Sequence, residues 1–236
     1  MKAVILAGGL GLRLREVVHN KPKSMASVRG RPFLQYQIEQ LREYGVDEII
    51  LCVAYLAHQI KAYFKEGRDF GVDIEYAIEK RPLGTGGALK NAQKYLKENT
   101  FLVLNGDTYV NIDLFDFMHY HRDKRSKGTI ALARVDKPEE YGTVLLDDSQ
   151  RIREFLEKSK TQGAYGIINA GVYLLEPEVL DYISPGKKIS LEKEIFPELL
   201  RRNLPLFGYL TSGYFVDIGT PEGYARIQKE LKKVKR

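Results

Sequence analysis

Three glycines and a group of basic side chains follow a short apolar run at the start of the chain. The apolar run covers residues 3–7, and the glycines after it are Gly8, Gly9 and Gly11. Backbone N–H groups of glycine can turn toward an anion, because a residue without Cβ tolerates positive φ and close approach. Four basic residues follow and add the charge that phosphate requires, namely Arg13, Arg15, Lys21 and Lys23. We therefore predict a phosphate-binding loop at residues 6–15.

Two other phosphate-binding patterns begin in the same way, and neither fits this loop. A dinucleotide-binding fingerprint requires a third glycine, but Leu14 stands at that position. The acidic residue expected about twenty residues later is also missing, because Glu39 lies within an expected helix. A P-loop requires Gly-Lys-Ser/Thr after its glycines, which the chain lacks. The glycines by themselves are equally compatible with a plain tight turn between a strand and a helix.

Two aspartates follow short apolar runs that lie far apart in the sequence. Asp107 follows the most apolar expected strand, and Asp217 precedes a helix that we expect to start at Pro221. Carboxylates at strand ends are natural ligands for Mg²⁺. A single Gly-Asp pair is merely a turn signal, so only the two aspartates together support a metal site.

A second glycine-rich turn follows another expected strand. Glu79 ends that strand, and a helix then opens with Pro82, Gly84 and Thr85. Open α/β sheets bind ligands at the carboxyl ends of their strands, where helix N-termini present N–H groups. A carboxylate at Glu79 could accept hydrogen bonds from a ligand at this edge of the sheet, and an exposed strand-end glutamate is the alternative.

The elements that position these residues alternate between strand and helix, the pattern of a parallel sheet covered on both faces. In the first half we expect strands at residues 3–7, 48–53, 73–79 and 100–105 and helices at 32–43, 57–64 and 86–95. In the second half we expect helices at residues 114–125 and 191–202 and strands at 129–135, 142–146, 151–157, 167–175 and 206–210. The predicted fold class is α/β, a three-layer α/β/α arrangement with a Rossmann-like, mostly parallel mixed sheet. We see no interior linker or repeat, so one domain is favoured over residues 1–236.

The composition excludes several other classes of protein. The one cysteine, Cys52, lies inside an apolar run, so we expect a buried structural thiol and no disulfide framework or Cys-based zinc site. The net charge of +6 includes a basic tail at residues 229–236, which is typical of a solvated helix end. The first apolar run is too short for a signal peptide, and no run approaches a membrane span. We expect a cytoplasmic protein with no membrane or nucleic-acid partner.

Residues 6–14 form a more specific pattern together with Lys21-Pro22-Lys23 than the glycines do alone. These residues resemble the signature of sugar-1-phosphate nucleotidyltransferases, Gly-Gly-x-Gly-Ser/Thr-Arg-Leu with a downstream Pro-Lys. The resemblance extends from Met1 to about Gln228 and is strongest toward heptose 1-phosphate and mannose 1-phosphate guanylyltransferases. It implies a glycosyltransferase-A-like nucleotidyltransferase fold whose substrates are a nucleoside triphosphate and a sugar 1-phosphate. The nucleotide-binding half would cover residues 1–112 and the sugar-phosphate-binding half residues 113–228.

The resemblance also implies a role for each matching residue. The triphosphate would lie against the backbone of Leu6, Ala7, Gly8, Gly9 and Gly11. The catalytic residues would be Arg13, which orients the β and γ phosphates, Lys23, which contacts phosphate at the reacting centre, and Asp107. Mg²⁺ is the implied cofactor, held by Asp107 and Asp217, while the base and ribose would contact Glu79, Pro82, Gly84 and Thr85. With Glu79 in this implied role, GTP is favoured, because a carboxylate can accept from N1–H and the exocyclic amine of guanine, whereas uracil offers one such donor. Leu12 departs from the family, because it removes the hydroxyl of the usual Ser or Thr.

The sugar side of the site should lie between the two aspartates in the sequence. Family motifs that contact sugar hydroxyls and the sugar phosphate match, in order, Tyr141, Gly142, Glu157, Lys158 and Asn169. Ser159 replaces the proline that usually follows Glu-Lys. Ser190 and Glu192 could add another sugar contact, or they could form a helix cap with Glu194.

Two other functions remain open at this stage. The protein could use UTP or dTTP with another sugar 1-phosphate, or it could be a catalytically silent subunit that senses nucleotide sugars. Many relatives continue into a left-handed β-helix, which we do not expect in this chain. We expect a minimal enzyme that is a monomer or a homodimer.

Overall fold

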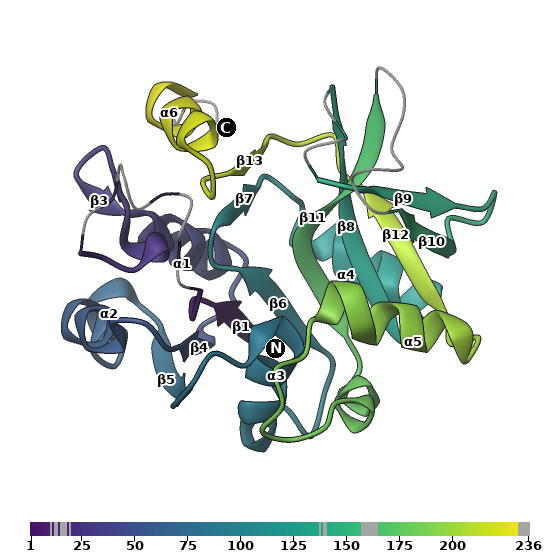
Figure 1. Cartoon of the computed structure of the whole chain (residues 1–236), viewed down its shortest axis with the longest axis horizontal. Coiled ribbons are helices and arrows are strands. Elements are labelled where there is room, and N and C mark those ends of the chain that lie inside the picture. The colour runs from purple at the N-terminus through teal and green to yellow at the C-terminus, as the bar shows by residue number, and fades with distance from the viewer. Residues whose placement is uncertain are drawn as a thin grey trace.

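A mixed sheet forms the centre of the protein in the computed structural model, which describes residues 1–9, 11, 14, 18, 20–136, 138, 141–156 and 165–230. Its strands lie in the order β12-β8-β11-β6-β1-β4-β5 (Figure 1). Their bounds are β1 Lys2–Leu6, β4 Glu48–Val53, β5 Asp73–Ile78, β6 Phe101–Asn105, β8 Gly128–Val135, β11 Gly166–Leu175 and β12 Leu206–Leu210. Neighbouring strands are parallel except at β11, which runs antiparallel to both β6 and β8. The predicted mostly parallel mixed sheet is confirmed.

The strand order reverses at β1. From β1 the chain moves outward to β4 and β5 on one side, and it then returns to β6 on the other side. Open α/β sheets bind ligands outside the carboxyl ends of the strands at such a reversal. A ligand site is therefore expected beside the ends of β1 and β6, near Leu6 and Asn105.

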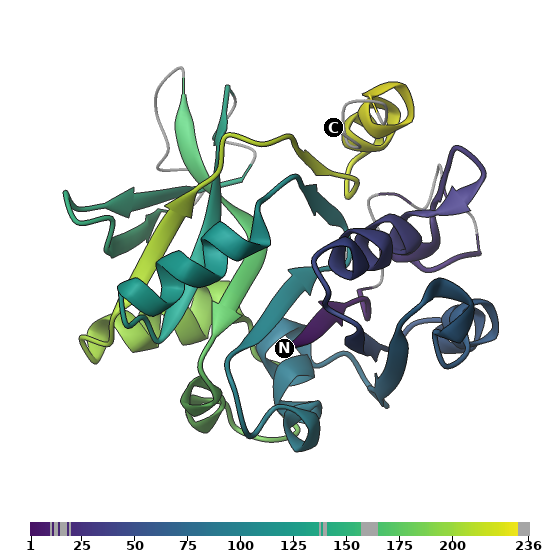
Figure 2. The ribbon, with the colours of Figure 1, turned by 180° about the vertical axis from the view of Figure 1, so that it is seen from behind.

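Helices cover both faces of the sheet, as the three-layer prediction requires. Figure 2 looks onto the layer that contains α1 (Phe33–Glu43) and α4 (Leu114–Asp123), and α2 (Ala57–Phe64) packs into the same apolar cluster. Figure 1 looks onto the opposite layer, which contains α3 (Gly84–Asn91) and α5 (Phe196–Arg201). Each layer closes over its own apolar cluster on the sheet.

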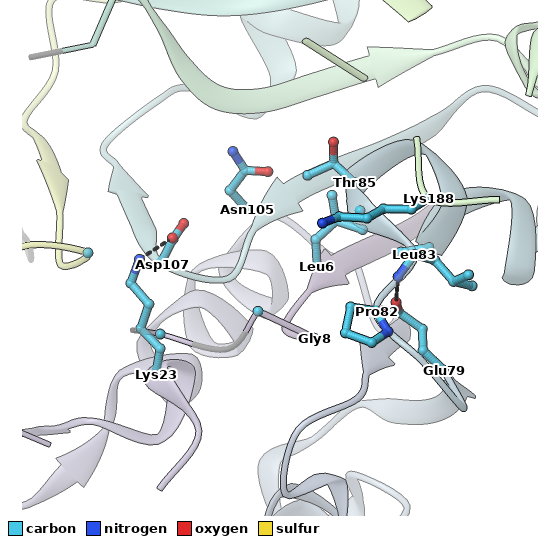
Figure 3. Close-up of a pocket in the computed structure, with 15 residues that line it drawn as sticks. Leu6, Gly8, Lys23, Glu79, Pro82, Leu83, Thr85, Asn105, Asp107 and Lys188 are labelled. Carbon is cyan, nitrogen blue, oxygen red and sulfur yellow. Dashed lines mark hydrogen bonds and ion pairs between the residues drawn. The ribbon is translucent and has the colours of Figure 1, made fainter. Parts of the chain in front are cut away.

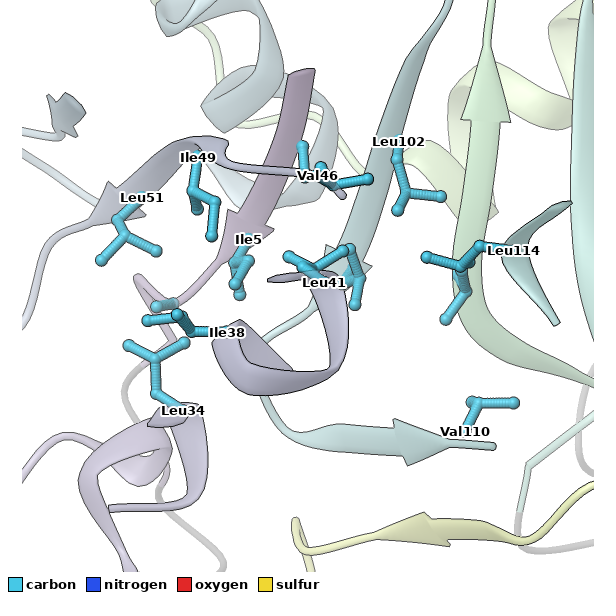
Figure 4. Close-up of a cluster of buried hydrophobic side chains, with 14 of the residues drawn as sticks. Ile5, Leu34, Ile38, Leu41, Val46, Ile49, Leu51, Leu102, Val110 and Leu114 are labelled. Atoms are coloured by element: carbon cyan, nitrogen blue, oxygen red, sulfur yellow. The ribbon is translucent and has the colours of Figure 1, made fainter. Parts of the chain in front are cut away.

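The core beneath α1 shows why this segment is helical. Leu34, Ile38 and Leu41 recur at helical spacing and are fully buried. Figure 4 shows them in one cluster with Ile5 and Leu51 of the sheet. Burying each of these side chains contributes roughly 1.5–3 kcal/mol. The packing fixes α1 against the strands that end at the expected ligand site.

Cys52 is fully buried on the opposite face of the sheet, within the second apolar cluster. Its Sγ donates weakly to Ala88 O at 3.6 Å. Burial raises the pKa of the Cys52 thiol far above its usual range, so the sulfur stays protonated. The predicted structural thiol is confirmed.

Short antiparallel strand pairs extend the fold beyond the central sheet. They are β2 (Ser27–Val28) with β3 (Arg31–Pro32), β7 (Thr108–Val110) with β13 (Phe215–Asp217), and β9 (Thr143–Leu146) with β10 (Ile152–Leu156). The last helix, α6 (Pro221–Glu230), follows β13 and contacts the β2–β3 pair through Tyr224 and Gln228 (Figure 1). Other helical turns are the 3₁₀ helices Lys23–Met25, Arg68–Phe70, Gln93–Tyr95 and Pro177–Tyr182 and the π-helix Leu191–Ile195.

Two expected helices differ in detail from the structure. The helix expected at residues 86–95 begins at Gly84 and ends at Asn91, and a 3₁₀ turn replaces its last part. The helix expected at residues 191–202 opens as a π-helix, in which Ile195 N donates to Ser190 O at 3.2 Å and Phe196 N donates to Leu191 O. Among the described residues, no helix combines the length and apolarity that crossing a membrane requires.

Candidate active site

A cavity of about 540 Å³ opens where the strand order reverses, at the carboxyl ends of β1 and β6 (Figure 3). Small-molecule sites commonly have volumes of roughly 300–1,000 Å³. Most of the wall consists of residues predicted to bind nucleotide or phosphate: Leu6, Gly8, Gly9, Gly11, Lys23, Glu79, Pro82, Gly84, Thr85 and Asp107. The other lining residues are Leu83, Ala88, Asn105, Lys188 and Gly219. The structure thus brings both predicted glycine turns and the first predicted aspartate to one place.

The first glycine turn approaches its neighbours too closely for larger side chains. A Cβ on Gly8 would lie 2.5 Å from Glu79 Oε1. Gly11 has a φ of 59°, and a Cβ there would lie 3.0 Å from Lys23 Cβ. Positive φ and close approach are the two properties for which the sequence predicted a glycine loop.

Backbone bonds join the start of this loop to the neighbouring strands. Gly106 N donates to Leu6 O at 3.0 Å, and Ala7 N donates to Cys52 O at 2.8 Å. Ala7 is buried and does not line the cavity. Arg13 lies outside the described residues, so its catalytic role stays a prediction.

Lys23 and Asp107 form an ion pair at one end of the cavity. The Lys23 side chain is 11% exposed and that of Asp107 is 34% exposed. Charges that lie partly out of water interact more strongly than charges on an open surface. At this end of the cavity, the ammonium group of Lys23 can bind phosphate and the carboxylate of Asp107 can bind a metal ion.

Two buried glutamines of α1 hold the loop that carries Asp107. Gln37 Nε2 donates to the carbonyl groups of Asn105 and Thr108, each at 2.8 Å. Gln40 Nε2 donates to Val110 O at 2.7 Å. Buried carbonyl groups need such partners, so α1 links the packing of the core to the position of Asp107.

Asp217 meets the Asp107 loop through the β7–β13 pair. Ile218 N donates to Asp107 O at 2.9 Å, and Asp217 is the register partner of Thr108. Asp217 Oδ1 accepts from Gly219 N at 2.5 Å, and Gly219 lines the cavity. The structure therefore brings the two predicted metal ligands together, although the chain separates them widely.

Glu79 lies at the other end of the cavity from Lys23 and is 8% exposed (Figure 3). Its Oε2 accepts from Leu83 N at 2.8 Å. Burial raises the pKa of Glu79 above its usual range, and the bond from Leu83 offsets part of this effect. The alternative of an exposed strand-end glutamate is wrong.

The second glycine turn uses its N–H groups differently from the prediction. Gly86 N and Gly87 N donate to Ile189 O at 2.9 and 3.2 Å, so they are not free for a ligand. The close approach requires glycine, because Gly84 has a φ of 71° and a Cβ there would lie 2.5 Å from Ile189 O. The segment before Ile189 is thereby docked on α3 and brings Lys188 to the cavity wall.

Lys188 is the main functional candidate that the sequence analysis missed. Its side chain extends along the cavity wall near Thr85 (Figure 3). The local sequence carries only a weak signal, the basic pair Lys187-Lys188 in a turn. Its place depends on the contact between Gly84 and Ile189, which no local pattern reveals.

Thr85 lines the cavity, but its hydroxyl group is bound within the protein. Its Oγ1 donates to Glu192 Oε2 at 2.7 Å and accepts from Leu191 N at 2.8 Å. Pro82 also lines the cavity, beside Leu83. Contact of Thr85 with base or ribose stays a prediction, and it would use other atoms than this hydroxyl.

Three of the predicted sugar-binding residues, Tyr141, Gly142 and Asn169, are described by the structure, and none of them lines the cavity. Asn169 Nδ2 donates to Tyr173 OH at 3.1 Å, and Tyr173 also lies 3.5 Å from Asn105 Nδ2. Tyr141 packs edge-on against Phe215 with ring centroids 5.7 Å apart, and Gly142 has a φ of 83°. Glu157 and Lys158 lie outside the described residues, so their contacts stay predictions.

Comparison with known proteins gives matches along nearly the whole chain. A family model described as nucleotidyl transferase matches residues 2–234. A mannose-1-phosphate guanylyltransferase of Mycobacterium tuberculosis is 37% identical over 230 residues, which cover 97% of this chain and 64% of that protein. A D-glycero-alpha-D-manno-heptose 1-phosphate guanylyltransferase of Aneurinibacillus thermoaerophilus is 39% identical over 232 residues, which cover 98% of both.

A solved structure shows the same fold. HddC from Yersinia pseudotuberculosis, complexed with GMP-PN, matches with a TM-score of 0.85 at 36% identity, covering 98% of this chain and 99% of that chain. The likeness confirms the predicted three-layer α/β/α class. The family model, the relatives and the solved structure all match the part of the chain that forms the cavity. The chain therefore belongs to the nucleotidyl transferase family.

Proposed function

We propose that this protein transfers guanosine monophosphate from GTP to heptose 1-phosphate or mannose 1-phosphate and releases pyrophosphate. The observation that carries the proposal is the cavity, with buried Glu79 at one end and the Lys23–Asp107 pair at the other. The names of the relatives support the choice of guanine and of these two sugars. The structure of HddC with GMP-PN supports a guanine nucleotide in the corresponding fold.

The guanine base would bind at the Glu79 end of the cavity. A guanine offers two adjacent donors, N1–H and the exocyclic amine, and a carboxylate can accept from both. Leu83 N and the close approach of Gly8 hold the Glu79 carboxylate in place. Nearby Leu6, Leu83 and Ala88 provide apolar wall for the faces of the ring.

The triphosphate would extend from the base along the first glycine turn toward Lys23. Gly8, Gly9 and Gly11 line this path, so phosphate oxygens can approach the backbone closely. Lys23 and Lys188 place ammonium groups on the same cavity, and each can bind a phosphate oxygen. Two anionic substrates need this positive charge before they can approach each other.

Asp107 and Asp217 fit a site for Mg²⁺. Hard oxygen ligands suit this ion, which usually takes one or two carboxylates together with substrate phosphates and water. Asp107 already binds the cation of Lys23, and the bond from Ile218 N to Asp107 O joins the two segments that carry the aspartates. Asp217 Oδ1 accepts from Gly219 N, and Gly219 lines the cavity. When bound, Mg²⁺ would neutralise charge that develops on the reacting phosphates.

The reaction needs little proton transfer from the protein. An oxygen of the sugar 1-phosphate would attack the α-phosphorus in line, and the bond from that phosphorus to the β-phosphate oxygen would break. The bonding electron pair would leave with pyrophosphate. The attacking oxygen is already anionic near neutral pH, so the chain contributes mainly by positioning both anions and offsetting their repulsion, through Lys23, Lys188 and the glycine backbone.

A substrate panel tests this proposal. GTP, ATP, UTP, CTP and dTTP are each combined with heptose, mannose and glucose 1-phosphates, and pyrophosphate release is measured with and without Mg²⁺. We expect the highest kcat/KM for GTP with heptose or mannose 1-phosphate, and none after removal of Mg²⁺ with EDTA.

Two outcomes would overturn the proposal. Preference for UTP or dTTP would show that Glu79 does not select guanine. Tight binding of nucleotide without pyrophosphate release at any Mg²⁺ concentration would identify a nucleotide-sugar sensor instead.

A further inference from the structure

Glu192 joins parts of the site that are far apart in the sequence. Its Oε2 accepts from Thr85 Oγ1 at 2.7 Å and from Ser190 Oγ at 2.8 Å. Its Oε1 accepts from Tyr173 OH at 3.0 Å. All three partners are neutral hydroxyl groups, and Thr85 lines the cavity. The carboxylate thus connects the nucleotide turn to strand β11.

The helix cap at this point does not need Glu192. Ser190 Oγ accepts from Lys193 N at 3.2 Å, and Glu194 Oε1 accepts from Ser190 N at 2.8 Å. These two bonds form the reciprocal pair of a capping box and satisfy two N–H groups at the start of the π-helical turn. The carboxylate of Glu192 binds neither of these N–H groups, and it accepts from the hydroxyl groups of Ser190, Thr85 and Tyr173.

A carboxylate fixes the direction of its hydrogen bonds, because it has no proton to donate. Tyr173 must donate its proton to Glu192, so its oxygen can only accept from other neighbours. It accepts from Asn169 Nδ2 at 3.1 Å and faces Asn105 Nδ2 at 3.5 Å. Burial and the nearby Glu192 hold the pKa of Tyr173 well above its usual range, so the hydroxyl keeps its proton.

This direction determines how the Asn105 amide is turned, whereas the N–H group of Gly171 is enough to fix the amide of Asn169. Asn169 directs Nδ2 to Tyr173, and its Oδ1 accepts from Gly171 N at 2.8 Å. Asn105 lines the cavity between Asp107 and Thr85 (Figure 3). Asn105 Oδ1 is buried and meets no donor among the described residues. The orientation of this amide therefore depends on the contact between Asn105 Nδ2 and Tyr173 OH.

We propose that Glu192 is a positioning residue for sugar discrimination. It fixes the proton direction of Tyr173, and Tyr173 in turn fixes the amide orientation of Asn105, so a sugar hydroxyl at this part of the cavity wall meets an amide that is always turned the same way. The inference rests on the proposed function, in which a sugar 1-phosphate reacts with the nucleotide in this cavity. It adds a reason why an epimer of the correct sugar is rejected, since a wrongly directed hydroxyl would leave a polar group without a partner.

Glu192→Gln tests the direction of the bonds while keeping the shape of the side chain. The new amide can donate as well as accept, so Tyr173 is no longer held in one direction. The measurement is kcat/KM for the preferred sugar 1-phosphate divided by that for its C2 epimer. We expect this ratio to fall about three- to tenfold, the usual effect of one hydrogen bond.

A second variant and a matched control make the result decisive. Tyr173→Phe removes the hydroxyl and should lower the same ratio, which protects the test if Glu192→Gln fails to fold. Glu194→Gln changes a carboxylate on the same turn that contacts Ser190 and not Tyr173, so its ratio should equal that of wild type. A purely structural role for Glu192 would lower the melting temperature and leave the ratio unchanged, and that result would overturn the inference.

Failure of the inference can be separated from failure of the proposed function. If wild type releases pyrophosphate from GTP and a sugar 1-phosphate but all variants keep its sugar ratio, only the role of Glu192 is wrong. If wild type neither turns over nor binds any sugar 1-phosphate in calorimetric titration, both proposals are wrong.

Discussion

Lys23 Nζ bonds to Asp107 Oδ2 inside the cavity, although the two residues are separated by 84 positions in the sequence. Gly219 lies against the same ammonium group, because a Cβ on Gly219 would overlap Lys23 Nζ. The internal cation therefore neutralises a carboxylate that is also the proposed ligand of Mg²⁺. Lys23 and the metal would compete for Asp107 in the absence of substrate, and phosphate would give Lys23 another partner.

Lys23→Met should therefore tighten the binding of a divalent cation to the substrate-free protein. Removing the ammonium frees Asp107 and also removes a repulsive positive charge. Calorimetric titration with Mn²⁺ measures this affinity directly, and we expect a decrease in Kd together with a loss of turnover. Lys21→Met is the matched control, because Lys21 is exposed and outside the cavity. Weaker Mn²⁺ binding in Lys23→Met would contradict the competition.

Asp107→Asn should abolish most of the activity without unfolding the protein. The amide keeps the shape of the side chain and removes the charge that attracts Mg²⁺. Changes to groups that merely support a metal ligand cost about 10- to 100-fold, so we expect a loss of kcat/KM of at least that size. Pyrophosphate release at saturating Mg²⁺ measures the loss. Full activity would show that Asp107 is not a metal ligand.

The affinity for GTP should fall when Glu79 takes up a proton. This should happen at a higher pH than the usual pKa of a glutamate. Burial raises the pKa of Glu79, so this carboxylate takes up a proton at a higher pH than an exposed one. The protonated form cannot accept from both guanine donors. We expect KM for GTP to rise toward acid pH in wild type. In Glu79→Gln this rise should be absent, because the amide does not titrate. Identical pH profiles would show that Glu79 does not bind the base.

Gln37→Leu should destabilise the protein and displace the loop that carries Asp107. The substitution leaves Thr108 O without its buried donor, and Asn105 O keeps a bond of 3.4 Å from Thr108 Oγ1. Each unsatisfied group costs about 1–3 kcal/mol. We expect a lower melting temperature and a lower kcat. Gln35→Leu on the same helix is the control, since Gln35 bonds to the side chains of Glu39 and Tyr63 near the surface and should cost much less.

Gly84→Ala should weaken binding at the cavity by moving the segment that carries Lys188. Gly84 and Gly186 both have positive φ, at 71° and 68°, so alanine strains the backbone at either position. Only at Gly84 would the new Cβ lie within 2.5 Å of Ile189 O, whereas nothing lies within 4 Å at Gly186. The backbone strain should cost both variants about 1 kcal/mol of stability, and the clash with Ile189 O should cost Gly84→Ala more. Only Gly84→Ala should also raise KM, and equal kinetics in both would contradict the role of this contact.

The sequence predicted the elements whose pattern is local. The strand at residues 48–53 and the helix at residues 57–64 have the predicted bounds, because each shows a clear apolar run or a clear helical period. The cavity could also be located, since glycines and charged residues mark the carboxyl ends of β1, β5 and β6. Local propensity and ligand chemistry agree at these points.

Contacts between distant segments could not be predicted. Gln37 occupies an ordinary position on an amphipathic helix, and only the folded chain brings its amide to the loop of Asp107. The three-residue strands β7 and β13 are too short to show a period, although their pairing brings Asp217 to Asp107. Lys188 reaches the cavity through the contact of Ile189 with α3. In each case the information lies in tertiary packing and has no local signature.

The fate of the α-phosphate tests the central claim most directly. GTP that carries ¹⁸O in the non-bridging positions of its α-phosphate is incubated with mannose or heptose 1-phosphate and Mg²⁺, and the products are analysed by mass. Guanylyl transfer predicts that the label appears in a GDP-sugar and that the pyrophosphate is unlabelled. Label in released phosphate or pyrophosphate, or no GDP-sugar at all, would contradict the account.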